Sequence, residues 1–336
     1  MANVSVIGTG TWGTTLAILL HENGHHVVAW SAIPEEIAML SEQREHKSLP
    51  GVHIPEGIQF TGDLEEACKE KELIVMAVPS IFTRSTSKKM ADIIPEGQLI
   101  VNVAKGIEED TLMTLSQQIE EEIPQANVAV LSGPSHAEEV SKSLPTTCVA
   151  GAKTMETAET VQNFFMAPTF RVYTSLDVLG IELGGSLKNV IALAAGIADG
   201  LGCGDNAKAA LITRGIVEIA RLGCEMGGKF ETFCGLSGIG DLIVTCASMH
   251  SRNRRAGILI GKGYTMQEAM NEVHMVVEGV YSAKAALKLG EKYHVDLPII
   301  QEVNEVLFHN RSAREAVFDL MLRERTTESF SLHLNK

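Results

Sequence analysis

The stretch Gly8-Thr9-Gly10-Thr11-Trp12-Gly13 decides the fold of this chain. It follows a β-rich run at residues 4–8 and precedes an apolar run at residues 14–22 with the pattern of a helix. In such a strand–turn–helix unit, the first glycine permits a tight turn, the second lets a pyrophosphate approach bare backbone, and the third brings helix and strand together. The helix N-terminus adds N–H donors and a partial positive charge. The stretch therefore predicts a dinucleotide-binding turn, with Gly8, Gly10 and Gly13 as its cofactor-binding glycines.

Short β-rich runs alternate with amphipathic helical segments through the first half of the chain, as is typical of βαβ units in a parallel sheet. We expect strands at residues 4–8, 26–30, 58–61, 73–78, 99–104, 128–132, 147–150 and 170–173. We expect helices between them at 14–22, 34–43, 64–69, 81–93, 112–122 and 155–165. After about residue 176 only helical patterns remain, at 178–198, 206–226, 266–271, 282–292 and 298–307. The predicted fold class is α/β: an N-terminal Rossmann-type doubly wound parallel sheet followed by an all-helical C-terminal domain.

The length of 336 residues and the hydrophobic content of 45% suit two moderate hydrophobic cores. We expect residues 1–180 to form the dinucleotide-binding domain and residues 181–325 to form a helical substrate and catalytic domain. The polar residues 326–336 are expected to be a mobile tail. A tight hinge between two such domains commonly forms a ligand-binding cleft.

The composition indicates which partners the chain is not expected to bind and whether its compartment is reducing. The chain has 28 Lys and Arg against 42 Asp and Glu, and this net charge of −14 repels nucleic acid and anionic membrane surfaces. Its apolar residues lie in short blocks, so we expect neither a signal peptide nor a membrane span. The 6 cysteines form no CxxC pair, which favours a reducing cytoplasm. A small anionic ligand would need a local concentration of Lys, Arg and helix N-termini.

The choice between NAD and NADP stays open at the sequence level. The end of the second expected strand normally carries an acid for the ribose 2′-hydroxyl or an Arg for a 2′-phosphate. Here that position reads Trp30-Ser31-Ala32, and the nearest charges, Glu35 and Arg44, stand further along the chain. The cofactor is therefore expected to be NAD or NADP. A second open position is Val78-Pro79-Ser80, which is either a loop against the nicotinamide ribose or a plain strand-ending turn.

A lysine on an apolar stretch is the main candidate for proton transfer. Lys188 lies in 183–190, where two glycines and several aliphatic residues leave the expected helix little polar face. A solvated surface lysine is the usual interpretation of a lone lysine. Partial burial instead lowers its pKa toward neutrality, where an amine can exchange a proton with the oxygen of a ketone that is being reduced.

Further cationic candidates follow the expected strands and a glycine-dense turn. Lys105 follows the fifth expected strand, at the carboxyl edge where open α/β sheets bind ligands. Three arginines in four positions follow the turn 235–242, namely Arg252, Arg254 and Arg255. They are either a solvated face or the best phosphate site in an acidic chain, because guanidinium binds phosphate bidentately. If the second interpretation holds, Lys188 and Arg252 must face the same crevice.

The chain resembles the bacterial NAD(P)-dependent glycerol-3-phosphate dehydrogenases over residues 4–322. The resemblance rests on GTGTWGTTLA (8–17), VAKGIE (103–108), LSGPSHAEEV (131–140), FRVYTSLDVLGIELGGSLKNVIALAAGIADGLG (170–202), NAKAALITRG (206–215), GLSGIGDLIVTC (235–246), SRNRR (251–255) and VVEG (276–279), in this order. It implies a two-domain enzyme, usually a homodimer, that interconverts sn-glycerol 3-phosphate and dihydroxyacetone phosphate. Its physiological role would be to supply glycerol 3-phosphate for phospholipid synthesis.

The resemblance also implies roles for individual residues. Lys188 matches the general acid/base of the family. The residues that match substrate-binding positions are Lys105, Gly133, Ser135, Lys188, Asn189, Asp241, Thr245, Ser251, Arg252 and Asn253. Besides the three glycines, the residues that match cofactor-binding positions are Thr11, Trp12, Lys105, Ala137, Arg252, Val276 and Glu278. The chain departs from the family at Ala32, where a basic residue or His is common, and at Ser48, where an aromatic is common.

Two other functions and one metal-binding motif are alternative interpretations of the sequence. A β-hydroxyacid dehydrogenase of similar layout would bind a carboxylate in place of a phosphate. A dinucleotide-sensing regulatory protein would bind NAD(H) without turnover. The HExxH pattern at residues 21–25 indicates zinc only on a continuous helix, and Asn23-Gly24 is typical of a helix end, so no metal site is expected.

Overall fold

The computed structural model describes residues 1–325 and 327–328 and contains one mixed sheet. Within this described part the sheet has 8 strands in the order β3-β2-β1-β4-β5-β6-β7-β8. The strands are β1 (Asn3–Ile7), β2 (His26–Trp30), β3 (Gln59–Thr61), β4 (Leu73–Met76), β5 (Leu99–Asn102), β6 (Asn127–Ser132), β7 (Thr146–Ala152) and β8 (Phe170–Ser175). They lie at the predicted positions, with ends that differ by a few residues.

The first six strands are parallel, and their carboxyl ends lie at one edge of the sheet. Val4 of β1 pairs with Val27 of β2 on one side and with Leu73 of β4 on the other, so the direction of winding reverses at β1. Ligands of open α/β sheets bind at the carboxyl edge next to such a reversal. One detail departs from the predicted all-parallel sheet: β7 pairs with β6 in antiparallel register, and β8 then pairs parallel to β7.

Both faces of the sheet are covered, because alternate strand residues pack into different cores. Val4 and Val6 share a core with Leu16 and Leu20 of the first helix, while Ile7 packs into the core on the opposite face. The helices that cover the sheet are α1 (Thr11–Glu22), α2 (Pro34–Gln43), α3 (Leu64–Cys68), α4 (Thr83–Met90), α5 (Leu115–Glu122), α6 (Ala137–Val140) and α7 (Met155–Phe165), with a single 3₁₀ turn, η1 (Ser80–Phe82), before α4. This two-sided burial explains the nearly continuous apolar strands.

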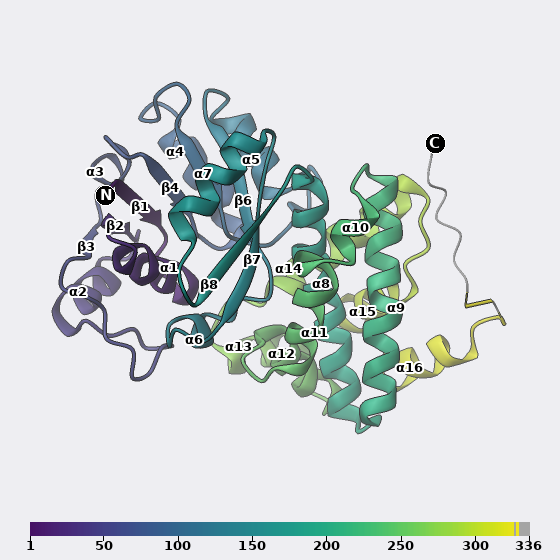
Figure 1. Ribbon diagram of the computed structural model, residues 1–336. Helices are drawn as coiled ribbons and strands as arrows, with labels where there is room; N and C mark the ends of the chain where they lie inside the picture. Colours follow the sequence, from purple (N-terminus) through teal and green to yellow (C-terminus); the bar gives the residue numbers. More distant parts are fainter. Residues whose placement is uncertain (326, 329–336) are drawn as a thin grey trace.

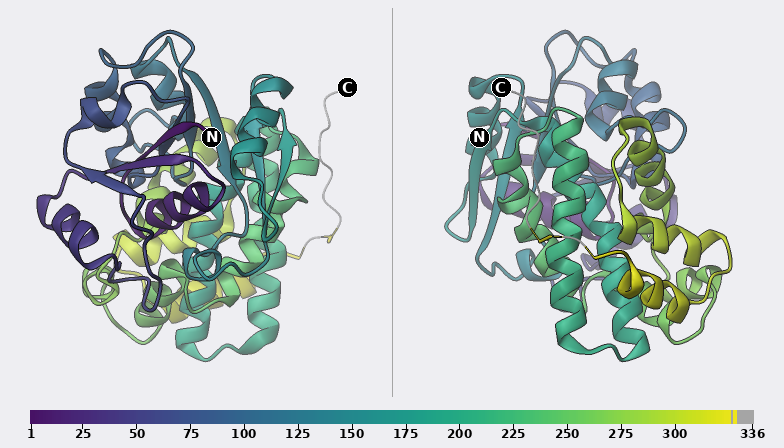
Figure 2. Two further views of the ribbon diagram at one scale, coloured as in Figure 1. Left: turned by 60° about the vertical axis from the view of Figure 1, so that its left-hand side comes forward. Right: turned by 90° about the vertical axis from the view of Figure 1, so that its right-hand side faces the viewer.

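The remainder of the chain is helical and surrounds one central helix, α8 (Val178–Leu201) (Figure 1). The other elements are α9 (Gly204–Glu225), α10 (Phe230–Phe233), the turn η2 (Leu236–Gly240), α11 (Asp241–Ala247), α12 (Arg252–Gly261), α13 (Met266–Val273), α14 (Glu278–Tyr293), α15 (Pro298–Phe308) and α16 (Ala313–Leu322). Figure 2 shows α8 and α9 as a long pair beside the α/β half. The first turns of α8 pack against β6 and β7, so this helix joins the two halves of the molecule.

The structure confirms the predicted fold class and adds helices that were not predicted. Asp241, at the end of the glycine-dense turn, is the first residue of α11. The three arginines lie on a helix, because residues 252–261 form α12. Pattern analysis missed α12 because its glycines serve packing: a Cβ at Gly257 would overlap the carbonyl oxygen of Leu193 in α8.

Two apolar stretches of the helical half are long enough to be compared with membrane spans. By length and composition, residues 178–201 and 230–247 are each apolar enough to cross a membrane. The first is a core helix, since 89% of its apolar window is buried, and the second is broken by the kink at Gly238. The tail expected at 326–336 lies outside the described residues, apart from 327 and 328.

Candidate active site

The nucleotide turn has the backbone that a pyrophosphate requires. Gly8 has a φ of +112°, and a Cβ there would lie 2.8 Å from the backbone nitrogen of Val78. A Cβ at Gly13 would overlap the carbonyl oxygen of Gly8, so the third glycine allows α1 to lie against β1. Gly10 differs, because it is exposed and nothing lies within 4 Å of its Cβ position. The turn is thus closed on its protein side and open on the other, as expected where a phosphate approaches the helix N-terminus.

The first turn of α1 presents a further unsatisfied group beside this opening. The hydroxyl of Thr11 is buried and has no hydrogen-bond partner among the described residues. Trp12 follows it and is half-buried against the core of the sheet. Ala137, the first residue of α6, lies next to α1, since its carbonyl accepts a weak hydrogen bond of 3.4 Å from Thr15. These predicted cofactor contacts therefore surround one helix N-terminus, and the donor set suits a dinucleotide.

A buried carboxylate bridges the two predicted site lysines. Asp241 Oδ1 lies 2.5 Å from Lys188 Nζ, and Asp241 Oδ2 lies 2.6 Å from Lys105 Nζ. Lys188 Nζ also donates to Thr245 Oγ1 at 2.6 Å, and Lys105 Nζ donates to the carbonyl oxygen of Gly133 at 3.1 Å. Lys188 and Asp241 are only 6% and 1% exposed. One loop and two helices thus converge on a compact cluster with one net positive charge.

Burial sets the ionisation of this cluster. The pKa of Lys188 is lowered to about 8: burial is the main cause, the charge of Asp241 opposes it, and the charge of Lys105 adds to it. Burial alone would raise the pKa of Asp241. The charges of the two lysines outweigh burial and hold this pKa below its usual range, so the carboxyl stays ionised. The neighbouring His136 has a lowered pKa for the same reasons, burial first and then the charge of Lys188. Lys188 can therefore gain or lose a proton close to neutral pH.

Hydrogen bonds beside this cluster connect α8 to the arginine helix. Asn189, which follows Lys188, accepts a bond of 2.9 Å at Oδ1 from Nδ2 of Asn253. Asn253 in turn accepts a bond of 2.9 Å from the backbone N–H of Gly279. Arg252 precedes Asn253 and is the first residue of α12. The residues next to Lys188 and Arg252 are thus in direct contact.

The arginine cluster divides into different roles. Arg254 is committed to Asp199 through contacts of 2.8 and 2.7 Å, so it does not serve a phosphate. Ser251 caps α12 by accepting a hydrogen bond from the backbone of Arg254. Arg252 makes no hydrogen bond or ion pair within the described part of the chain, and burial lowers its pKa although Glu278 opposes this. Of the three arginines expected at the phosphate, Arg252 alone stands at the start of α12 with its donors uncommitted.

Glu278 joins the helical half to the loop after β4. It is the first residue of α14, and its carboxylate accepts hydrogen bonds from the backbone N–H of Ser80, at 3.1 Å, and from the hydroxyl of Ser80. Gly106, next to Lys105, packs so closely on Ser80 that a Cβ would overlap its side chain. Val276, two residues before Glu278, is half-buried. Of the two open interpretations of residues 78–80, these contacts favour a loop that belongs to the site.

The loop that carries Lys105 is held by residues that pattern analysis missed. Glu182 of α8 accepts hydrogen bonds from the backbone N–H and the hydroxyl of Ser116, at 2.9 and 2.5 Å. Ser186, one turn later, donates to the carbonyl oxygen of Gly106 at 3.1 Å. The signal was the placement of two polar residues four apart in the otherwise apolar stretch 178–187, which puts them on one face of the helix.

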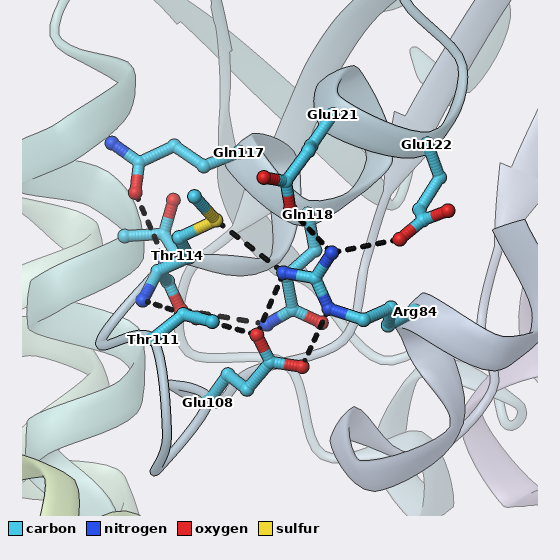
Figure 3. A network of polar contacts seen from close by, with 9 residues as sticks. Arg84, Glu108, Thr111, Thr114, Gln117, Gln118, Glu121 and Glu122 are labelled. Atoms are coloured by element: carbon cyan, nitrogen blue, oxygen red, sulfur yellow. Dashed lines mark hydrogen bonds and ion pairs between the residues drawn. The ribbon is translucent and has the colours of Figure 1, made fainter. Parts of the chain in front are cut away.

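An ion-pair network extends this support on the other side of the loop (Figure 3). Arg84 binds Glu108 bidentately, with distances of 2.8 and 2.7 Å, and also contacts Glu121 and Glu122 of α5. These contacts raise the pKa of Arg84 further, chiefly through the bond to Glu108. The segment after Lys105 is thereby tied to α4 and α5.

Two other positions named from the family resemblance make contacts of their own. Ser135 Oγ donates to the carbonyl oxygen of Gly133 at 3.0 Å, and Ser48, where the family commonly has an aromatic, contacts the sulfur of Met275 at 3.9 Å. Ser132, which was not predicted, has a buried hydroxyl without a partner in the described region, and it lies 2.9 Å from the Cβ position of Gly185. A separate surface cavity of about 710 Å³ lies between β7, β8 and residues 229–237, and none of the predicted site residues lines it.

Comparison with known proteins agrees with this geometry. Residues 3–158 match the family model of the NAD-dependent glycerol-3-phosphate dehydrogenase N-terminus, and residues 177–318 match that of its C-terminus. The glycerol-3-phosphate dehydrogenase (NAD(P)+) of Agathobacter rectalis is 65% identical over 333 residues, which are 99% of each chain. The protein of the same name from Fusobacterium nucleatum is 60% identical and covers 98% of this chain and 99% of its own length.

Solved structures give the same result. The crystal structure of glycerol-3-phosphate dehydrogenase from Coxiella burnetii superposes with a TM-score of 0.93 at 34% identity, covering 96% of this chain and 99% of the other. The sequence motifs, the glycine turn and the lysine–aspartate cluster thus lie in a chain that matches its relatives from end to end. This chain belongs to the NAD-dependent glycerol-3-phosphate dehydrogenase family.

Proposed function

We propose that this chain catalyses hydride transfer between NAD(P)H and dihydroxyacetone phosphate, and the reverse oxidation of sn-glycerol 3-phosphate. The observation that carries the proposal is the Asp241-bridged pair of Lys105 and Lys188. Asn189, the residue after Lys188, is hydrogen-bonded to Asn253, the residue after Arg252. Acid/base chemistry and anion binding are thereby combined in one place. The likeness to dehydrogenases of this name over nearly the whole chain supports the assignment.

Lys188 acts as the general acid/base in this proposal. Reduction of the ketone adds a hydride to C2 and a proton to its oxygen, and the bound nicotinamide supplies the hydride. Lys188 gives the proton, and in the oxidative direction it takes the proton from the C2 hydroxyl. Its pKa of about 8 suits both directions near neutral pH.

Asp241 orients the two amines, and Lys105 places a second positive charge beside the reacting oxygen. Such fixed charges stabilise the alkoxide character that develops on the C2 oxygen. Asn189, Thr245, Gly133 and Ser135 complete the pocket for the three-carbon chain. The protein therefore contributes positioning and electrostatics, and the cofactor contributes the redox chemistry.

Arg252 binds the substrate phosphate in this proposal. It has uncommitted guanidinium donors at the N-terminus of α12, where the backbone N–H groups add partial positive charge. Asn253 and the N-cap Ser251 fix this end of the helix. A carboxylate substrate would use the same charge but leave part of the donor set unpaired, so a 3-hydroxy acid is the less favoured substrate.

The cofactor is assigned to the glycine turn and the residues around it. Gly8, Gly10, Gly13, Thr11 and Trp12 would hold the pyrophosphate. Ala137, Val276 and Glu278 would line the remainder of the dinucleotide, with Lys105 and Arg252 at its reactive end. We keep the division into residues 1–180 and 181–325 as the proposed nucleotide and substrate domains.

The proposal includes a cellular context. We infer from the family resemblance a cytoplasmic homodimer that supplies glycerol 3-phosphate for phospholipid synthesis, and the acidic composition supports a small-molecule ligand over nucleic acid or a membrane surface. Sedimentation of the purified protein would test the dimer directly.

The proposed activity is tested by Lys188→Ala. With NADH or NADPH and dihydroxyacetone phosphate, wild type is expected to oxidise the cofactor, while Lys188→Ala loses at least about 10³-fold in kcat and still binds the cofactor. Lys208→Ala is the matched control, because Lys208 also pairs with an acid, Asp199 at 2.8 Å, outside the site. Wild-type turnover by Lys188→Ala, or a preference of wild type for a 3-hydroxy acid, would overturn the proposal.

A further inference from the structure

The adenosine end of the nucleotide site contains a carboxylate that sequence spacing did not single out. Glu36 lies in the first turn of α2, and its Oε2 accepts hydrogen bonds from Ser31 Oγ at 2.5 Å and from Thr9 Oγ1 at 2.7 Å. Ser31 directly follows β2, and Thr9 belongs to the glycine turn; both are buried. A helical residue therefore occupies the place where dinucleotide-binding folds carry an acid at the end of β2.

The carboxylate is held through one oxygen and keeps the other available. Both hydroxyls donate to Oε2, whereas Oε1 accepts no hydrogen bond from the described residues. The side chain is half-buried, so its charge stays partly in contact with solvent. Glu36 is thus oriented by the glycine turn itself and retains the acceptor sites of Oε1.

Arg44, the charged residue that follows α2, does not offset this negative charge. Arg44 is turned into its own loop, where it donates to the carbonyl oxygen of Ile58 at 2.7 Å and pairs with Glu56 at 3.3 Å. Ala32 is exposed and uncharged. His46 is buried close to Glu36, and burial lowers its pKa although the charge of Glu36 opposes this. Neither Arg44 nor Ala32 therefore neutralises the charge of Glu36.

We propose that Glu36 selects NAD(H) over NADP(H) in this chain. Its Oε1 accepts a hydrogen bond from the 2′-hydroxyl of the adenosine ribose, and its charge repels a 2′-phosphate. A ribose hydroxyl is a donor that a carboxylate binds well, whereas a phosphate beside the same carboxylate places like charges together. This inference rests on the proposed function, because it assigns the cofactor of that same site.

Direct binding measurements test the inference without turnover. Full-length protein is titrated with NADH and with NADPH, and binding is followed by nicotinamide fluorescence and by calorimetry. We expect the Kd for NADPH to exceed that for NADH by at least about tenfold, and the ratio to shrink as salt rises. If neither cofactor binds, the proposed function fails together with the inference. If both bind equally well, the inference fails and the proposed function stands.

Two variants and one control locate the effect. Glu36→Gln removes the charge and should tighten NADPH binding by at least about tenfold, while NADH binding weakens by about threefold or less. Ala32→Arg leaves the Glu36 contacts in place and adds a cation at an exposed position, so it should also tighten NADPH binding even if Glu36→Gln unfolds. Glu35→Gln, an exposed neighbour with the same charge change, should leave the ratio unchanged. An unchanged ratio in both Glu36→Gln and Ala32→Arg would overturn the assignment, as would an equal effect of Glu35→Gln.

Discussion

Removal of the carboxylate between the two lysines should move the pH dependence of the reaction. Asp241→Asn keeps the size of the side chain but deletes its charge, which lies 2.5 Å from Lys188 Nζ and 2.6 Å from Lys105 Nζ. Opposite unit charges about 4 Å apart interact by about 4 kcal/mol at an effective dielectric constant near 20. Lys188 experiences this charge in full, but the amide oxygen of the asparagine can still accept its hydrogen bond, so we expect a net loss of about 2 kcal/mol, or about 1.5 pKa units, at Lys188.

The sign of the effect follows from the role of the amine. Lys188 must be protonated to reduce the ketone, so the reductive rate should fall as pH rises through its pKa of about 8. In Asp241→Asn the amine loses the charge that favoured its protonated form, and the falling limb should move to about pH 6.5. In the oxidative direction the unprotonated amine is active, so the rising limb should move to lower pH by the same amount.

The assay is kcat/KM for dihydroxyacetone phosphate, measured from about pH 5.5 to 9.5 at saturating NADH, a range that covers the falling limbs expected of wild type and of Asp241→Asn. Asp199→Asn is the matched control, because that acid pairs with Arg254 and Lys208 away from the lysine cluster. Thermal unfolding and NADH binding of both variants separate loss of fold from loss of chemistry. If kcat/KM falls at the same pH in wild type and Asp241→Asn, the assignment of the titrating group to Lys188 is refuted.

Three further changes test other parts of the site. Arg252→Ala should raise KM for the phosphorylated substrate by at least about tenfold with a smaller change in the Kd of NADH, and an unchanged KM would place the phosphate elsewhere. Gly10→Ala meets nothing within 4 Å, so its Tm should match wild type while NADH affinity falls by about tenfold or more; wild-type affinity would exclude close approach of the cofactor. Glu182→Ala leaves the N–H of Ser116 unpaired and should lower the free energy of unfolding in urea by about 2–4 kcal/mol, which a change below about 0.5 kcal/mol would contradict.

Local patterns were sufficient to locate the strands and most helices of the α/β half, because these elements are specified by their own residues, although the antiparallel direction of β7 was not predicted. The strand runs and the glycine turn each carry a period or a backbone requirement that does not depend on distant partners. Helices α12 and α11 were missed for the opposite reason. The arginines and glycines of α12 have weak local helical patterning, and packing against α8 stabilises them instead.

The candidate site shows the same division between local and distant information. The sequence alone, through motifs and family resemblance, named Lys188, Lys105, Asp241 and Arg252 as members of one site. The sequence could not show which charged residues pair with each other. Arg254 pairs with Asp199 because helices from different parts of the chain pack together.

The cofactor question shows the limit most clearly. The sequence determined that a dinucleotide turn follows β1, because glycine at three fixed spacings meets steric demands within a single unit. It was silent at residues 30–32, since the acid arrives from α2 and not from the strand. Only the tertiary structure brought Glu36 to Ser31 and Thr9, and Asp241 to both lysines. Neighbouring residues specify local backbone conformation, whereas charge pairing depends on distances between side chains that are fixed only when the chain has folded.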